Sequence, residues 1–120
     1  MAKYSIVVSE VFQALADPTR CAIVSALVGG AQTVSRLAEP FDMALPSFLK
    51  HLTILERSGL ISTSKLGRTR TCELVPARLS QAEQWIAEQR AMWESRSDRM
   101  VDFVERLHQE EQIHDSKRRK

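Results

Sequence analysis

The 120-residue sequence predicts a mostly α-helical domain with one small β-hairpin, and three observations lead to this prediction. Between Thr33 and Val75, a short helical pattern, a turn and a longer helical pattern precede a basic stretch centred on Gly67. A helical pattern without Pro or Gly then follows from residue 79. The 43% of hydrophobic residues can form a single modest core. This order of elements is typical of a winged helix-turn-helix with long N- and C-terminal helices.

The chain organisation is expected to be simple. We expect one domain over residues 1–112 and a basic, disordered tail over 113–120, which ends in four Lys or Arg residues. The sequence contains no run of about 18 apolar residues and no secretory signal pattern, so no contact with a membrane is expected. Cys21 and Cys72 are far apart and lack the C-x-x-C spacing. We therefore expect a cytoplasmic protein in which both cysteines are packing residues, with redox sensing as the alternative.

The charges are distributed unevenly along the chain. Residues 1–78 carry nine Lys or Arg against six Asp or Glu, whereas residues 79–116 carry four against nine. Such a separation is expected when one part of a protein meets a polyanion and another part meets protein. The alternative is that both charge blocks are only solvated surface.

The first half of the chain contains three helical patterns. The first helix has apolar residues at steps of three and four and ends near Ala16. These residues are Val7, Val8, Val11, Phe12 and Leu15. Asp17 is expected to cap the second helix, with Pro18 in its first position and Gly29–Gly30 after its end. Its inward residues would be Ile23, Val24, Leu27 and Val28. Thr33 would cap a short third helix, and residues 40–44 would form a turn.

The fourth helix, over residues 45–57, has two different faces. At about 100° per residue, Phe48, Leu52 and Leu55 lie together and predict a core-facing stripe. The other side and its flanks carry candidate DNA-binding residues, which are Pro46, Ser47, Leu49, Lys50, Thr53 and Arg57. Cationic side chains can contact phosphate or guanine, and hydroxyls can contact phosphate or base edges. The alternative is an ordinary amphipathic surface helix.

The segment 61–75 predicts the hairpin, or wing. Its tip carries the candidate DNA-binding residues Lys65, Arg68, Thr69 and Arg70, and Glu73 is the lone acid. An ordinary surface hairpin would mix charges of both signs, so this composition favours contact with the phosphates of double-stranded DNA.

The length and the apolar repeat of the last helical segment predict a homodimer. Ser80 and Glu83 form a capping box at its expected start. Apolar residues then recur every seven positions, at Ile86, Trp93, Met100 and Leu107, and Ala82 and Phe103 adjoin this seam. A helix of about thirty residues is roughly 45 Å long, more than so small a core can cover. We expect a twofold dimer formed by this seam and by Val7, Val8 and Val11. The alternative is a helix folded back over its own domain.

Several motifs, taken in this order, resemble the ArsR-type (arsenic-repressor-like) bacterial transcription regulators. The resemblance covers roughly residues 4–107 and is carried by Leu15–Arg20, Lys50-His51-Leu52, Leu55–Ile61 and Gly67–Arg68. It implies a homodimeric winged-helix repressor that leaves its operator when an effector binds, and the residues do not indicate which effector. Ala44, Leu45 and Leu49 stand where the family often has polar residues, and apolar side chains there can contact a thymine methyl group.

The resemblance suggests metal sensing, but the pattern of candidate metal-ligating residues does not support it. Residues 33–39 contain no Cys, and His108 with Glu111 matches only half of the other common site. The remaining half would fall on Ser95 and Ser97, which are poor zinc ligands. The segment Phe41–Met43 and the Trp-containing last helix resemble a non-metal branch.

We therefore expect no metal and no cofactor. An enzyme is not expected either, because no phosphate-binding loop, nucleophile elbow or catalytic cluster is present. Two alternatives to DNA-binding regulation without metal stay open. They are a dimeric protein-interaction module of winged-helix fold without DNA binding, and a metal-responsive repressor.

Overall fold

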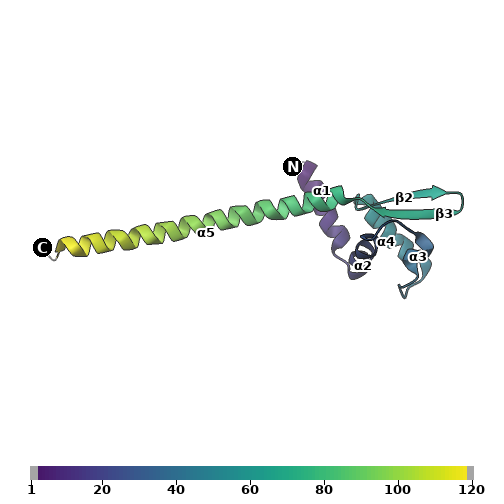
Figure 1. The fold of residues 1–120 in the computed structure, drawn as a ribbon, viewed down its shortest axis with the longest axis horizontal. Coiled ribbons are helices and arrows are strands. Elements are labelled where there is room, and N and C mark those ends of the chain that lie inside the picture. Colours follow the sequence, from purple (N-terminus) through teal and green to yellow (C-terminus); the bar gives the residue numbers. More distant parts are fainter. Residues whose placement is uncertain (1–2, 119–120) are drawn as a thin grey trace. The chain divides into compact units, whose positions relative to one another are not determined.

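The computed structural model describes the backbone of residues 3–118 and the side chains of residues 6–115. Its elements are α1 (Lys3–Leu15), α2 (Pro18–Leu27), β1 (Gln32–Thr33), α3 (Val34–Ala38), α4 (Leu45–Arg57), β2 (Ile61–Leu66), β3 (Thr69–Leu74) and α5 (Pro76–Arg118), as drawn in Figure 1. The prediction of a mostly helical winged helix-turn-helix is confirmed. The chain forms two compact units, Met1–Gln84 and Trp85–Lys120, where a single domain over 1–112 was expected.

Local capping explains where the helices α2 and α3 of the first unit begin. A carboxylate oxygen of Asp17 accepts a hydrogen bond from the backbone N–H of Arg20 at 3.0 Å, and Pro18 opens α2. The hydroxyl of Thr33 accepts from the backbone N–H of Arg36 at 3.3 Å and starts α3. Both predicted caps are confirmed. The prediction that Val28 is buried is wrong, because this residue follows the last turn of α2 and is exposed.

The end of α4 sets the direction in which the hairpin begins. Gly59 has φ +83°, and its N–H donates to the carbonyl of Glu56 while that of Leu60 donates to the carbonyl of Leu55. These two bonds form a Schellman motif, which satisfies carbonyls that the helix leaves unpaired. Leu55 and Leu60 are both buried, so the motif also joins the end of the helix to the core.

The hairpin belongs to a three-stranded antiparallel sheet with the order β1-β3-β2. The pairs Ile61–Leu74 and Leu66–Thr69 mark the two ends of the β2–β3 ladder. Gly67 has φ +64° in the two-residue connection, a conformation that glycine adopts without strain. The short strand β1 was not expected, because two residues carry no periodic pattern.

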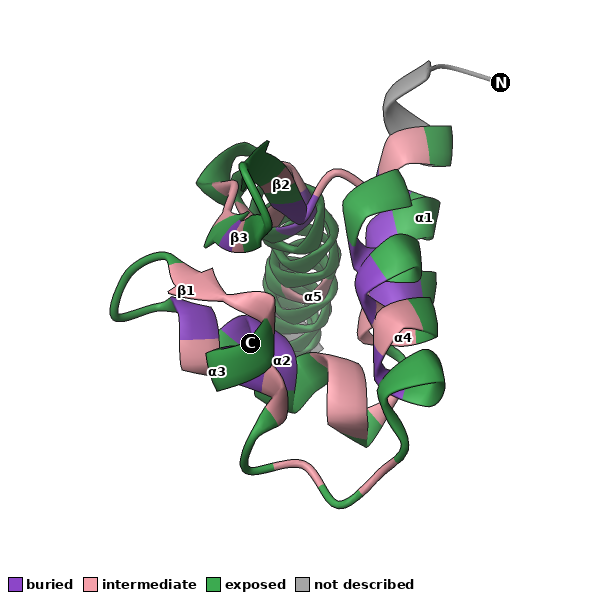
Figure 2. Cartoon of the chain, turned by 90° about the vertical axis from the view of Figure 1, so that its right-hand side faces the viewer, coloured by how far each residue is buried: buried purple, intermediate pink, exposed green. Residues whose placement is uncertain are grey.

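The core lies within the first unit and combines residues from its helices and strands (purple in Figure 2). The predicted stripe Phe48, Leu52 and Leu55 is fully buried, and the ring of Phe48 lies 5.3 Å from that of Phe41. Val8 and Val11 are also buried, with 3% and 0% of their surface exposed, as is Ala82. The prediction that these three side chains form a dimer surface is therefore wrong.

Helix α5 begins earlier and ends later than expected. It starts at Pro76, where proline fits the first helical position, so the prediction of a capping box at Ser80 is wrong. It continues to Arg118, so residues 113–118 are helical, whereas a disordered tail was expected there. The last two residues of the expected tail lie outside the described residues. No Pro or Gly follows Pro76, and the segment is rich in Ala, Glu, Gln and Arg, which favour helix.

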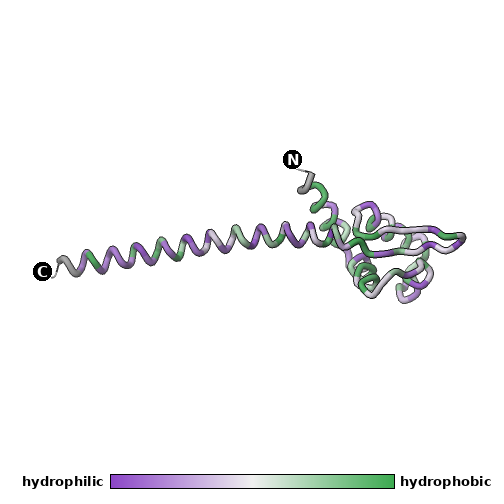
Figure 3. The backbone as a smooth tube through the Cα atoms, turned by 45° about the horizontal axis from the view of Figure 1, so that its top comes forward, coloured by the Kyte–Doolittle hydropathy of each residue, from purple (hydrophilic) through white to green (hydrophobic). Residues whose placement is uncertain are grey.

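The composition of α5 is mixed along its whole length. Polar and apolar residues alternate along it in Figure 3. Within residues 3–118, no helix is long and apolar enough to cross a membrane.

Candidate nucleic-acid interface

A groove of about 710 Å³ lies between the start of α3, the start of α4 and the hairpin. Its lining consists of Thr33, Val34, Ser35, Leu45, Leu49, Thr63, Ser64, Lys65, Arg68, Thr69 and Arg70. The lining therefore carries three cations and no carboxylate. Five of the candidate DNA-binding residues meet here, although they come from two segments of the sequence. Such a surface is complementary to a polyanion.

The outward side of α4 contains the remaining candidates. Pro46, Ser47, Lys50, Thr53 and Arg57 are exposed, and Leu49 is half-buried. Pro46, Leu49, Lys50 and Thr53 share a shallow depression of about 510 Å³ with Ile54. Leu49 thus lies at the boundary between this depression and the groove.

Arg57 is separated from the other candidates. It lines a different hollow of about 330 Å³, together with Glu10 and Gln13 of α1. The sequence pattern placed Arg57 on the reading side of α4, but the structure places it toward α1. A contact of Arg57 with base edges is therefore less favoured than a contact of Lys50.

The hydroxyl of Thr53 is engaged within its own helix. It donates a hydrogen bond to the carbonyl of Leu49 at 3.0 Å. While this bond is present, the oxygen can only accept a hydrogen bond from outside. The Thr53 hydroxyl can therefore accept a hydrogen bond from an amino group on a base edge. It is less suited to a phosphate oxygen, which can only accept.

The wing is fastened to the end of α4 by Glu56. Its carboxylate accepts a hydrogen bond from the hydroxyl of Thr63 at 2.8 Å and pairs with the guanidinium of Arg70 at 3.3 Å. Both partners of the ion pair are partly exposed, so the pair contributes at most about 1 kcal/mol to stability. Its main consequence is positional, because it fixes the base of the wing relative to α4.

Glu73 is the lone acid of the hairpin segment itself, but Glu56 of α4 adds a second carboxylate beside it. Sequence reasoning missed Glu56 because it lies in another element and 14 residues before Arg70. Among the side chains described, those of residues 6–115, neither Lys65 nor Arg68 takes part in an ion pair. Lys65 and Arg68 are thus the more available cations of the wing, and Arg70 is partly neutralised.

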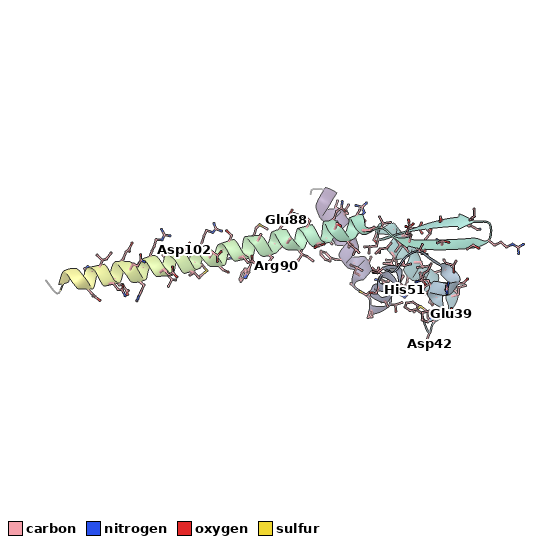
Figure 4. All side chains as sticks on the ribbon, in the orientation of Figure 1. Glu39, Asp42, His51, Glu88, Arg90 and Asp102 are labelled. Atoms are coloured by element: carbon pink, nitrogen blue, oxygen red, sulfur yellow. The ribbon has the colours of Figure 1, made fainter. Side chains whose placement is uncertain are left out.

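A polar cluster of Asp17, Arg20 and His51 joins the first helices to α4. Arg20 donates from Nε to the carbonyl of Ala14 at 2.6 Å, and its Nη1 lies 3.3 Å from Nδ1 of His51. The hydrogen bond from the backbone N–H of Arg20 lowers the pKa of Asp17; partial desolvation opposes this effect, and the charge of the Arg20 guanidinium adds to it. Figure 4 shows that His51 lies among the helices of this unit. The cluster links α4 to the first two helices, and none of its three residues lines the groove.

The apolar repeat of the second unit is exposed in the single chain. Ile86, Trp93, Met100, Phe103 and Leu107 have between 42% and 67% of their surface accessible. On α1, Ile6 is exposed and Val7 half-buried, so the outward apolar surface of α1 includes a residue that was not predicted.

The cysteines and the half metal site lie outside the groove. Cys72 is buried, which raises the pKa of its thiol and confirms it as a packing residue. The prediction that Cys21 is a packing residue is wrong, because Cys21 is exposed. Its thiol donates a hydrogen bond to the carbonyl of Leu15. Cys21 lies beside the buried stripe of α2 that carries Ile23. His108 hydrogen-bonds Gln112 at 3.2 Å. The described residues contain no cluster of three or more His, Cys, Asp or Glu able to hold a metal ion.

Comparison with known proteins gives a consistent result. Residues 15–63 match a helix-turn-helix domain family. The transcriptional repressor SdpR of Bacillus subtilis is 40% identical over 60 residues, which are 50% of this chain and 67% of SdpR. The HTH-type transcriptional regulator Rv2034 of Mycobacterium tuberculosis is 36% identical over 69 residues, or 58% and 64% of the two chains.

Solved structures extend the similarity to most of the chain. The crystal structure of an ArsR family transcriptional regulator is 54% identical, with a TM-score of 0.74, and the match covers 79% of this chain and 98% of that one. An ArsR-like transcriptional regulator from Rhodococcus sp. RHA1 is 28% identical, with a TM-score of 0.71 and coverages of 79% and 90%.

Proposed function

Because the chain belongs to the ArsR family of DNA-binding transcriptional regulators, we propose that it represses transcription as a homodimer in the cytoplasm. One observation carries this proposal. The start of α4 and the cations of the wing line a single groove without any carboxylate. An ordinary helix and hairpin on a protein surface would not be expected to share such a one-sided surface.

In the proposed complex, α4 enters the major groove and the wing follows the backbone. The major groove of B-DNA, about 12 Å wide, admits a helix with its side chains. Lys50 and Thr53 would then face base edges, while Lys65 and Arg68 would contact phosphates. The pair between Glu56 and Arg70 would hold the wing at the distance that this arrangement needs.

The homodimer would form through the exposed apolar repeat of α5. This helix has 43 residues, and its repeat recurs every seven positions from Ile86 to Leu107. A twofold axis would place two copies of α4 about one DNA turn apart, roughly 34–36 Å, on a palindromic operator. Gln89 and Arg96 interrupt the seam, so we expect a dimer of moderate stability.

Binding to the promoter of its own gene, measured by fluorescence anisotropy over a range of salt concentrations, tests the proposal. We expect the affinity for this promoter to fall steeply with salt, because counterions are released from the DNA. Arg68→Ala should weaken binding to operator and random DNA similarly and reduce the salt slope by about one unit. Arg70→Ala should reduce it less, since Glu56 already neutralises part of that charge.

The matched control is Arg90→Ala, which removes the same charge from α5 outside the groove. It should leave the salt slope unchanged. A variant with Lys65, Arg68 and Arg70 all changed to Ala that binds as tightly as the parent would contradict the docking of the wing on DNA.

A further inference from the structure

Helix α4 contributes two leucines to the lining of a groove that also carries three cations. Leu45 is the first residue of α4 and has 53% of its surface exposed. Leu49 is half-buried and lies four residues further along, so both leucines share one face of the helix. Both line the groove. Together they form an apolar strip along the first turn of the helix that is proposed to enter DNA.

Folding does not account for the exposed leucine. Leu45 lies outside the buried core and outside the apolar residues that pack against it, whereas Leu49 is among the latter. A polar residue at the first position of a helix would serve the fold at least as well. The exposed side chain of Leu45 is therefore available to contact a molecule that binds in the groove.

The charges around the strip identify what can cover it. Lys50 follows on α4, and Lys65, Arg68 and Arg70 of the wing line the same groove as the strip. An apolar peptide or lipid chain would leave these cations without partners. The occupant must therefore combine a polyanionic frame with a small apolar group. Double-stranded DNA meets both conditions, because thymine presents a 5-methyl group in the major groove between two phosphate backbones.

We infer that Leu45, supported by Leu49, contacts the 5-methyl group of a thymine in each operator half-site. This inference rests on the proposed function, since it requires α4 in the major groove. At this position the protein would read a base through an apolar contact, where a polar side chain would use hydrogen bonds. Leu45 thus becomes a specificity-determining residue, and Leu49, which packs against the core, lies next to it on the same face of α4.

The test removes the methyl group from the DNA and leaves the protein intact. In vitro selection from random duplexes supplies the operator, and each thymine in it is then replaced by deoxyuridine, which lacks only the methyl group. We expect one position per half-site at which the replacement weakens binding about fourfold, which corresponds to about 0.8 kcal/mol for one buried carbon. Replacement in both half-sites should weaken it about 16-fold, because distant sites add.

The protein variant completes a double-mutant cycle. Leu45→Ala should bind the thymine and deoxyuridine operators equally, and should keep any other thymine dependence that the parent shows. Any effect of deoxyuridine on the flexibility of DNA is shared by both proteins and cancels in the cycle. Val28→Ala is the matched control, because it shortens an exposed apolar side chain outside the groove and should retain the fourfold difference.

The possible failures are distinguishable. If the parent selects a specific operator but no deoxyuridine replacement matters, the thymine contact is wrong and the proposed function stands. If the penalty persists undiminished in Leu45→Ala, another side chain reads the methyl group and the assignment to Leu45 is wrong. If selection yields no specific sequence, both the inference and the proposed function are wrong.

Discussion

The two units of this chain treat their apolar residues in opposite ways. In Met1–Gln84, apolar stripes from α1, α2, α4 and the sheet share one core. In the described part of Trp85–Lys120, none of residues 85–115 is buried. Yet this unit contains ten of the sixteen exposed large apolar side chains of the described chain. The first unit therefore buries most of its large apolar side chains within one chain, whereas the second leaves its apolar side chains exposed.

The difference follows from what a single helix can do. Several helices and a sheet can turn their apolar faces toward one another, but one helix cannot bury its own stripe. Most helical stability in proteins comes from packing of such a stripe, so α5 beyond Gln84 needs another surface. The seven-residue spacing from Ile86 to Leu107 is suited to a second copy of the same helix.

The largest expected effect is that of Trp93→Asp, which places a charge in the middle of the repeat. It should convert the dimer to monomer and lower operator affinity by about 10²–10⁴-fold, because two linked reading helices become independent. Sedimentation velocity and anisotropy measure both effects. Amide hydrogen exchange should show lost protection in residues 85–118 and retained protection in the core of the first unit.

Ser95→Asp is the control for Trp93→Asp, since it adds the same charge two residues away and outside the repeat. It should leave the dimer and its affinity for the operator intact. A parent protein that sediments as a monomer at micromolar concentration would contradict the proposed dimer.

Phe48→Ala should have the next largest effect and should act on the first unit alone. Phe48 is 1% exposed and contacts the ring of Phe41. Its truncation should lower the free energy of unfolding by about 3–5 kcal/mol, because a buried cavity remains. Urea unfolding measures this value. Val28→Ala, at an exposed position, should change it by less than about 0.5 kcal/mol, and a similar loss in both variants would argue against this core.

A smaller effect is expected at Asp17. Its pKa is lowered below the unfolded value of 3.8, mainly by the hydrogen bond from the N–H of Arg20. The charged carboxylate therefore contributes stability that is complete above 3.8 and is lost as the pH falls through the lower folded value. Asp17→Asn keeps a capping oxygen but removes this titration.

We therefore expect the parent to lose more stability than Asp17→Asn when the pH is lowered from about 5 toward 2, as measured by urea unfolding at each pH. Asp42→Asn makes the same charge change in the turn before α4, at an exposed position (Figure 4), and should behave like the parent. Equal acid sensitivity of the parent and Asp17→Asn would refute the assigned contribution.

No effect is expected from metal ions. Zinc, cadmium or arsenite at low micromolar concentration should not release the protein from its operator, because His108 and Glu111 supply only half of a site. Anisotropy in the presence of each metal measures this. Stoichiometric zinc binding that disappears in His108→Ala would overturn the prediction.

Features that depend on neighbouring residues were predictable from the sequence. The caps at Asp17 and Thr33 need only a side chain three residues from a free N–H. The stripe of Phe48, Leu52 and Leu55 and the turn at Gly67 likewise follow from helix geometry and from the freedom of glycine. These local rules were enough to predict helix α4 and the hairpin, on which the proposed DNA-binding residues lie.

Features that depend on distant residues were decided only by the tertiary structure. The burial of Val8 and Val11, the pairing of β1 with β3 and the attachment of Arg70 to Glu56 all join segments far apart in the chain. The position of Arg57, which lines a hollow with residues of α1, likewise depends on residues far away in the sequence. Periodicity shows that a face is apolar or charged, but it does not show which surface will cover it. Which surface covers a given face depends on how several apolar stripes pack together, so it can be read only from the tertiary structure.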